Sequence, residues 1–137
     1  MAKRLSATKS TARLGNSTST KATPLGKLKK KMDTVFSRWI RNRDNAKCFT
    51  CGKVGTVETM QAGHYISRSV LSLRWDERNV HCQCMPCNIW KHGALDVYAL
   101  NLQLKYGDGI LKELARMKNT RIRFSSKELE EMIKKYS

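Results

Sequence analysis

Hydrophobic residues recur with helical spacing after Pro24. They stand at Leu28, Met32, Val35, Phe36, Trp39 and Ile40, separated by 4, 3, 1, 3 and 1 positions. This spacing places them on one face of a helix with a 3.6-residue period. Residues 24–46 are therefore predicted as a basic amphipathic helix that ends near Asp44. Its other surface includes Lys29, Lys30 and Lys31, which either contact DNA or face solvent.

Residues 94–137 carry further helical patterns. The first is stopped near Gly107, and the last begins at Ser125-Ser126-Lys127-Glu128. That sequence predicts a capping box with Ser125 as the N-cap. We expect these C-terminal helices to pack against the rest of the domain and to carry no catalytic residue.

The segment between them, residues 48–93, alternates turns with short strand-like pieces. A β-leaning piece is predicted at 54–60, a second at 62–67, and a loop at 67–77. A helix is predicted from Pro86 to Gly93. The expected fold class is α+β and mainly helical, with a small core flanked by N- and C-terminal helices in a single domain, 24–137.

Residues 1–23 are rich in Lys, Arg, Ser and Thr and have almost no large apolar residue. Such a segment cannot bury enough apolar surface to order itself. We predict a flexible basic arm. It either lies along phosphates or only keeps the protein in solution.

The charge balance indicates a polyanionic partner. The chain has 27 Lys+Arg against 11 Asp+Glu, for a formal net charge of +16, and nucleic acid is the partner that such an excess favours. No apolar run approaches the ~18 residues of a membrane span, and no secretory signal is recognisable. We therefore expect a cytoplasmic protein without a membrane partner.

The cysteines form two Cys-x-x-Cys pairs. Cysteines of a reducing compartment are metal ligands more often than disulfides, and two such pairs suit one tetrahedral Zn²⁺. The predicted structural zinc ligands are Cys48, Cys51, Cys84 and Cys87. Cys82 remains and is expected to be a small buried residue.

A second, harder metal and a base are suggested by polar residues between and just after the pairs. A neutral His64 can take a proton from water that attacks a phosphodiester. Asn88 and His92 are four residues apart, so on a helix they share a face and can point at one Mg²⁺ or Mn²⁺. Asn79 can hold the His64 loop through backbone hydrogen bonds.

Basic side chains follow His64 along the chain. Arg68, Arg74, Arg78 and Lys91 are candidate DNA contacts, because guanidinium groups match phosphate oxygens; ordinary surface charge is the alternative. Trp75 either stacks on an unpaired base or packs in the core.

These motifs together resemble a known family. The order Cys-x-x-Cys, Gly63-His64, Asn79, Cys-x-x-Cys-Asn88 is similar to the zinc-containing HNH (ββα-metal) nucleases. A closer resemblance is to the NinG/Rap recombination proteins of tailed phages, carried by Ile40-Arg41-Asn42-Arg43-Asp44, Ala62-Gly63-His64-Tyr65, Asn79-Val80-His81 and Gln83-Cys84. It runs from about Leu28 to the C-terminus.

The resemblance implies a zinc-bound ββα-metal core over residues 48–93. It implies His64 as general base, Asn79 as the central Asn and Asn88 as a metal ligand, with His92 at a position that binds metal in some relatives. The implied activity is structure-selective endonuclease cleavage of branched recombination intermediates such as Holliday junctions or D-loops, in the host cytoplasm.

Gly63 departs from the pattern, since many HNH nucleases carry Asp or His immediately before the base. The ion would then rely on Asn88, His92, His64 itself, or an acid such as Glu58 or Asp76. His81 either joins the site or makes a structural hydrogen bond.

Two functions remain on these grounds. The first is a metal-dependent endonuclease of one-metal HNH type acting on branched or duplex DNA, as a homodimer if it resolves a two-fold junction. The alternative is a non-catalytic zinc-ribbon accessory protein that binds nucleic acid.

Overall fold

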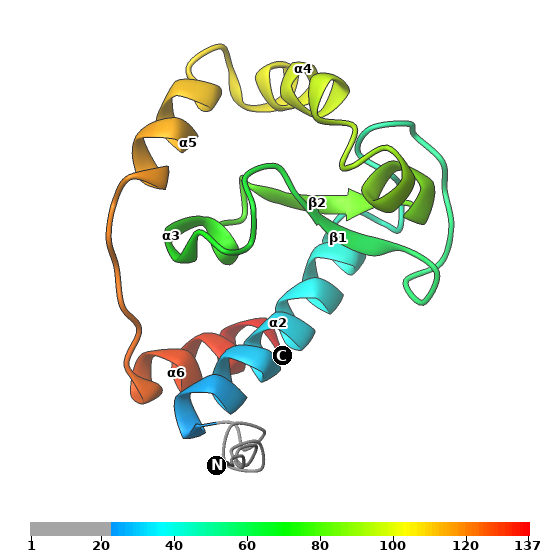
Figure 1. Ribbon diagram of the computed structural model, residues 1–137. Coiled ribbons are helices and arrows are strands. Elements are labelled where there is room, and N and C mark those ends of the chain that lie inside the picture. The colour runs from blue at the N-terminus through cyan, green and yellow to red at the C-terminus, as the bar shows by residue number, and fades with distance from the viewer. Residues whose placement is uncertain (1–22) are drawn as a thin grey trace, which may run out of the picture.

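The computed structural model describes residues 23–137, in which helices surround a two-stranded sheet (Figure 1). The elements are, in chain order, α2 (Pro24–Arg43), β1 (Gln61–His64), α3 (Leu71–Arg74), β2 (Val80–Gln83), the π-helical turn η3 (Pro86–Trp90), α4 (Leu95–Tyr106), α5 (Ile110–Lys118) and α6 (Ser126–Tyr136). The arm predicted for residues 1–23 lies outside the described residues, except for Thr23.

The long helix α2 confirms the amphipathic pattern. Thr23 caps its N-terminus, where Oγ1 accepts a hydrogen bond from the Gly26 amide at 2.9 Å, and Pro24 occupies the first turn. Both features are favoured at helix starts. The helix ends at Arg43, because Asn45 and Ala46 take positive φ angles and turn the chain toward the first cysteine pair.

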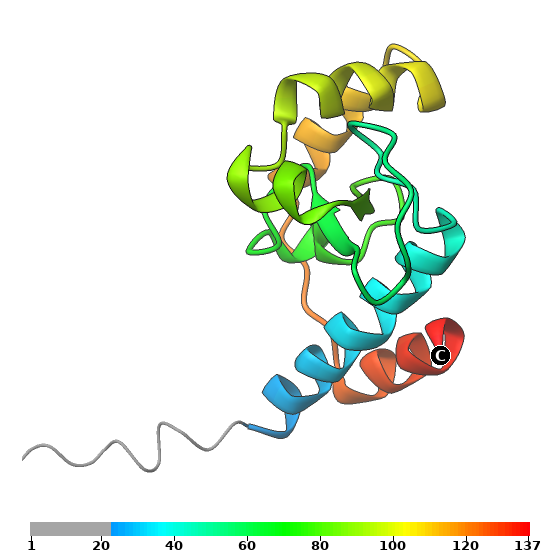
Figure 2. The ribbon, with the colours of Figure 1, turned by 90° about the vertical axis from the view of Figure 1, so that its right-hand side faces the viewer.

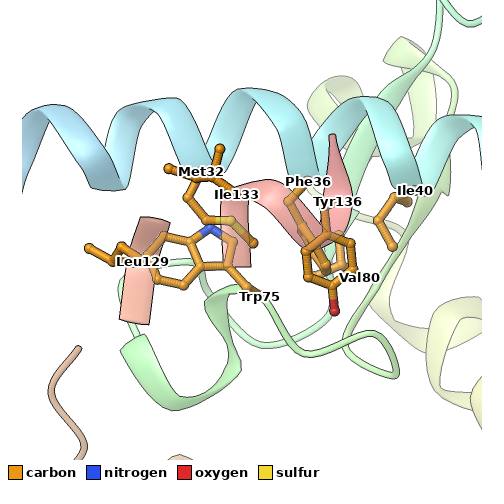
Figure 3. Close-up of a cluster of buried hydrophobic side chains, with 8 residues drawn as sticks. All are labelled: Met32, Phe36, Ile40, Trp75, Val80, Leu129, Ile133 and Tyr136. Atoms are coloured by element: carbon orange, nitrogen blue, oxygen red, sulfur yellow. The ribbon is translucent and has the colours of Figure 1, made fainter. Parts of the chain in front are cut away.

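The largest apolar cluster joins the two ends of the chain. Figure 3 shows side chains of α2 meeting those of α6, with Trp75 and Val80 beside them. The cluster consists of Met32, Phe36, Ile40, Trp75, Val80, Leu129, Ile133 and Tyr136. Trp75 therefore packs in the core, as one of its two predicted roles requires.

The sheet is an antiparallel pair in which His64 lies opposite Val80 and Gly63 opposite His81. Side chains alternate between the faces of a strand. Val80 accordingly joins the α2 cluster, whereas the His81 ring lies against α4, where it contacts Tyr98. All four residues of β2 are buried, so this strand is covered on both faces.

The C-terminal helices also match their patterns. Gly107 ends α4 with a positive φ, and Ser125 and Glu128 form the predicted capping box of α6. Leu73 of α3 packs with side chains of α4 and α5 in a second apolar cluster. None of the helices between residues 23 and 137 has the length and apolar character needed to cross a membrane.

Three local expectations were wrong. Residues 54–60 form no strand and contribute only a bridge between Lys47 and Val54. The loop predicted at 67–77 contains α3. The helix after Pro86 is a π-helical turn that ends at Trp90, because Lys91 donates to the Pro86 carbonyl and His92 adopts a φ of 50°.

Candidate metal centre and active-site cleft

Four cysteine sulfurs converge on one point. The Sγ atoms of Cys48, Cys51, Cys84 and Cys87 all lie within 4.8 Å of one another, and Cys51 and Cys84 are 3.6 Å apart. A tetrahedral zinc with Zn–S bonds of about 2.3 Å separates its sulfurs by about 3.8 Å. The predicted ligand set therefore comes together with the spacing that a metal such as zinc requires.

The cysteine cluster fastens two distant segments. Cys48 and Cys51 lie on the turn that follows α2. Cys84 directly follows β2, and Cys87 lies in the first turn of η3. Burial raises the pKa of Cys48, but hydrogen bonds from the Thr50 hydroxyl and nearby amides lower it to about 6. A metal bound here would fix the position of η3, and with it Asn88.

Cys82 takes no part in this cluster. It is fully buried on β2, and burial together with the charge of Asp44 raises its pKa to about 11. A buried cysteine that stays protonated is a small apolar residue. This confirms the role predicted for Cys82.

A cleft of about 700 Å³ opens beside the sheet. It is bounded by α2, β1, the loop and short helix after β1, and the end of η3. Five of the predicted site residues line it: His64, Arg68, Arg74, Asn88 and His92. Residues separated by up to 28 positions in the sequence thus meet at one surface.

The His64 ring is held in one tautomer. Its Nε2 lies 2.8 Å from the Arg74 carbonyl oxygen, which can only accept, so Nε2 carries the proton and Nδ1 keeps a lone pair. Burial, the largest influence, and the positive charge of Arg68 lower the pKa of His64 below its ordinary value. A neutral imidazole with a free Nδ1 has the properties of a general base.

Asn88 and His92 supply the other candidate ligands. Asn88 donates from Nδ2 to Gln61 Oε1 at 2.8 Å, which leaves its Oδ1 as an acceptor. His92 lies just beyond η3, so the two residues do not share a regular helical turn as predicted. The reversal of the chain at His92 and Gly93 nevertheless brings both to the cleft.

Asp33 of α2 connects the arginines of the cleft. Its carboxylate accepts from Arg74 Nε at 2.9 Å, from Arg68 Nη2 at 2.6 Å and from Trp75 Nε1 at 2.9 Å. Although burial raises the pKa of Asp33, the hydrogen bonds of Arg74 and Trp75 hold it below its ordinary value. The same Arg74 therefore links Asp33 through its side chain to His64 through its carbonyl.

Asp33 is a residue of the cleft that the sequence motifs did not predict. Acids other than Asp33 are absent from the stretch between Pro24 and Arg43, and Asp33 lies one turn from Phe36 and Ser37 beside the apolar stripe. A single acid next to the buried face of a strongly basic helix was the available signal. The acids considered instead, Glu58 and Asp76, do not line the cleft, and Asp76 binds Arg78.

Asn79 lies behind the cleft and is fully buried. Its Oδ1 accepts from the Ile66 amide at 2.8 Å, and its Nδ2 donates to the carbonyls of Ile66 and Leu73 at 2.9 and 3.0 Å. All its side-chain bonds go to backbone on either side of Arg68. Asn79 thus fixes the loop after His64 and does not reach the cleft.

His81 is a structural residue. The Tyr98 hydroxyl donates to the Gly63 carbonyl at 2.7 Å, so it accepts from His81 Nδ1 at 3.2 Å, and His81 Nε2 accepts from the Tyr106 hydroxyl at 2.9 Å. Burial, with Arg43 nearby, lowers the pKa of His81 to about 3. A neutral, fully bonded imidazole outside the cleft leaves the structural hydrogen bond as its role.

Gly63 is required by the packing of Gln83. A Cβ added at Gly63 would lie 1.8 Å from Gln83 Oε1, and the Gln83 amide is buried and fixed by bonds to Thr50 and the Gly93 carbonyl. Among the described side chains, Gln83 Oε1 is the buried oxygen without a hydrogen-bond partner. A metal-ligating side chain could not occupy position 63 in this structure.

The remaining basic candidates lie outside the cleft. Arg78 pairs with Asp76 and contacts the Met117 sulfur. Lys91 is exposed next to His92 but does not line the cleft. Lys29, Lys30 and Lys31 on α2 do not line it either. Within residues 23–137, no third His, Cys, Asp or Glu joins His64 and His92 in a metal-binding cluster.

Comparison with known proteins gives one family. The family model described as "Bacteriophage Lambda NinG protein" matches residues 1–137. The relative "Protein ninG" of Escherichia phage 933W is 34% identical over 87 residues, which cover 62% of this chain and 43% of that protein. "Protein ninG" of Salmonella phage P22 is 34% identical over 62% of this chain and 42% of its own length.

"Protein ninG" of Escherichia phage lambda is 33% identical over 87 residues, again with 42% of that protein covered. The chain thus matches less than half the length of these curated relatives. No solved structure matches it.

Proposed function

The chain belongs to the NinG family, and from this premise we propose that it is a metal-dependent endonuclease that hydrolyses phosphodiester bonds in branched DNA. The substrates we propose are recombination intermediates such as Holliday junctions and D-loops. The observation that carries the proposal is the fixed tautomer of His64 in a cleft shared with two arginines, Asn88 and His92.

His64 acts as the general base in this proposal. With Nε2 donating to the Arg74 carbonyl, Nδ1 takes a proton from a water molecule as that water attacks phosphorus. Burial keeps the imidazole neutral at pH 7, because it lowers the pKa of His64. Removing this base should lower the rate by roughly 10²–10⁴-fold.

Asn88 and His92 are the proposed ligands of a single Mg²⁺ or Mn²⁺. The Asn88 oxygen is free because its amide nitrogen binds Gln61, and His92 lines the same cleft. Such an ion keeps several water ligands, so few protein ligands suffice. It would neutralise the charge that develops on the scissile phosphate and the leaving oxygen.

Arg68 and Arg74 are the proposed phosphate clamps. Both bind Asp33 at the wall of the cleft, and this pairing holds the guanidinium groups in place before DNA arrives. Arg68 is the more exposed of the two, with 61% of its side chain accessible against 19% for Arg74. We therefore assign phosphate contact mainly to Arg68 and positioning of His64 mainly to Arg74.

The test is a cleavage assay with the zinc-loaded protein on a four-way junction, a D-loop, a flap and a linear duplex of matched sequence. We expect cuts near the branch with Mg²⁺ or Mn²⁺ and none without a divalent ion. We also expect the active form to be a homodimer in the host cytoplasm, because a two-fold junction presents two scissile strands.

A non-catalytic zinc-ribbon protein that binds branched DNA is the second candidate. It is favoured by the engagement of the Asp33 carboxylate, which leaves no free acid in the described lining of the cleft. Tight junction binding without cleavage under any divalent ion would support this role and exclude the endonuclease.

A further inference from the structure

A second basic groove is lined in part by Val70, Leu71 and Ser72, which stand between Arg68 and Arg74 in the sequence. Its volume is about 560 Å³, and it is lined by side chains of α3, the end of α5 and the α5–α6 connector. The basic residues of this groove are Lys118, Arg121 and Arg123. No acid is among the described residues that line it.

The connector presents its arginines outward. Along Arg121-Ile122-Arg123-Phe124 the exposure alternates, with both arginines exposed and both apolar residues partly buried. Phe124 packs edge-on against Trp75, with ring centroids 5.4 Å apart. Figures 1 and 2 show the connector as an extended segment between α5 and α6, and it shares the lining of the groove with α3. In an extended chain, residues two apart point the same way.

These cations differ from the arginines of the cleft, because their side chains have no partner within residues 23–137. Arg68 and Arg74 bind Asp33, and Arg78 binds Asp76. The side chains of Lys118, Arg121 and Arg123 form no hydrogen bond or ion pair with a described residue. Binding a polyanion here would break no existing ion pair.

The groove also has a fixed geometry. Ser72 donates from its hydroxyl to the Met117 carbonyl at 2.7 Å and so ties α3 to the end of α5. The segment from Arg68 to Arg74 contributes to both openings, since its outer residues line the cleft and Val70, Leu71 and Ser72 line the groove. The cleft and the groove therefore have fixed positions relative to each other.

We propose that α3 and the α5–α6 connector form a second phosphate-binding groove, which takes a DNA arm other than the one in the cleft. The groove supplies unpaired guanidinium and ammonium groups, which bind backbone phosphates without reading sequence. Two arms held in fixed relation distinguish a branched DNA from a linear one. This inference rests on the proposed function, because a second arm matters only at a branch.

The test compares Arg121→Ala/Arg123→Ala with the parent in full-length, zinc-loaded protein. Binding to a four-way junction and to a linear duplex is measured over a range of salt without a catalytic divalent ion. We expect the junction affinity to fall about tenfold and its log–log salt slope to decrease by about 2. The linear-duplex affinity should change little.

Lys112→Ala/Arg116→Ala is the matched control. It also removes two exposed charges, but from the part of α5 outside the groove, so it should leave the preference for junctions intact. Lys118→Gln removes a single charge from the groove and should lower the log–log salt slope of junction binding by about 1. Melting curves of all variants verify the fold.

Three outcomes overturn the proposal. The first is an equal loss of affinity for linear and branched DNA in Arg121→Ala/Arg123→Ala. The second is a loss of junction affinity no larger than that of the control. The third is that Arg121→Ala/Arg123→Ala weakens binding of a polyglutamate peptide and leaves DNA binding unchanged, which would assign the groove to an acidic protein. Because binding is measured without cleavage, failure of the proposed endonuclease is detected separately, as a parent that binds junctions and cuts none.

Discussion

At the scale of single residues, the site depends on a few side chains that hold others in place. Asp33, Asn79 and Gln83 each bond to a segment beside the cleft, and none of them carries out the proposed chemistry. Gly63 belongs to the same group, because the Gln83 amide fills the space where its side chain would be. Substitutions at Gly63 and Asp33 therefore test how the site is held in place.

Gly63→Ala should destabilise the fold by roughly 1–3 kcal/mol, since the added methyl overpacks a buried site. The new Cβ would lie 1.8 Å from Gln83 Oε1, on a fully buried side chain whose amide nitrogen is bonded to Thr50 and Gly93. Thermal melting measures the effect. Gly109→Ala is the control, because nothing lies within 4 Å of its Cβ position and its φ is −82°; equal melting temperatures for the two variants would refute the packing argument.

Asp33→Asn should destabilise the protein by about 1–3 kcal/mol, because the bonds to Arg68, Arg74 and Trp75 lose the carboxylate charge and one of its two acceptor oxygens. Cleavage should also slow, since Arg74 would no longer be held where its carbonyl receives His64. Single-turnover rates and melting temperatures test both effects. Glu113→Gln breaks an exposed ion pair with Arg116 and should change neither; an unaltered Asp33→Asn protein would contradict the positioning role.

At the scale of secondary-structure elements, local signals were sufficient for α2, α4, α5 and α6. Their apolar periods, the Thr23 and Ser125 caps and the Gly107 stop are all encoded in neighbouring residues. Residues 54–60 and 86–92 could not be predicted in the same way. Thr56 and Thr59 bond to each other in a turn, and the Gly55 amide donates to the Ala46 carbonyl. The second segment carries Cys87, which lies in the four-cysteine cluster. Neither arrangement produces an alternating or helical apolar pattern.

The same difference between local and distant signals applies to the candidate site. The sequence pointed to the four cysteines that come together and to five residues that line the cleft. It held one hint of Asp33, a lone acid on a basic helix, but not its partners, because the side chains that bind Asp33 are 35 to 42 positions away. It also could not explain Gly63, whose requirement comes from a side chain on the neighbouring strand.

The four-cysteine cluster joins separate elements, and its removal has a testable effect. Cys48→Ser should lower both the zinc content and the melting temperature, because a structural metal contributes directly to folding. Asn88 and His92 should lose their place in the cleft, since Cys84 and Cys87 hold the start of η3. Cys82→Ala is the control and should retain one zinc per chain, as measured by elemental analysis. Full zinc content in Cys48→Ser would show that the cluster is not the metal site.

At the scale of the whole molecule, the excess of positive charge is the main feature for binding a partner. The full chain has a net charge of +16. Within the described residues, lysines and arginines lie on α2, around the cleft and along the α5–α6 connector. The acids of the cleft wall and of the β2 edge are already paired with arginines. A polyanion would therefore meet a positive surface from several elements at once.

Affinity for DNA should fall steeply with salt, because bound phosphates release counterions. About five phosphate contacts predict a log–log slope of about −4.5 and a loss of roughly 10²–10³-fold between 50 and 200 mM salt. Fluorescence anisotropy with a labelled junction measures this slope. A slope near zero would be incompatible with phosphate contacts as the main source of affinity.

The central claim is that His64 is the base of a DNA-cleaving site. Its most direct test is the single-turnover cleavage rate of His64→Ala on a four-way junction with Mg²⁺ or Mn²⁺, compared with the parent at equal zinc content, melting temperature and junction affinity. We predict a rate lower by about 10²–10⁴-fold. A His64→Ala protein that cuts the junction as fast as the parent would contradict the account.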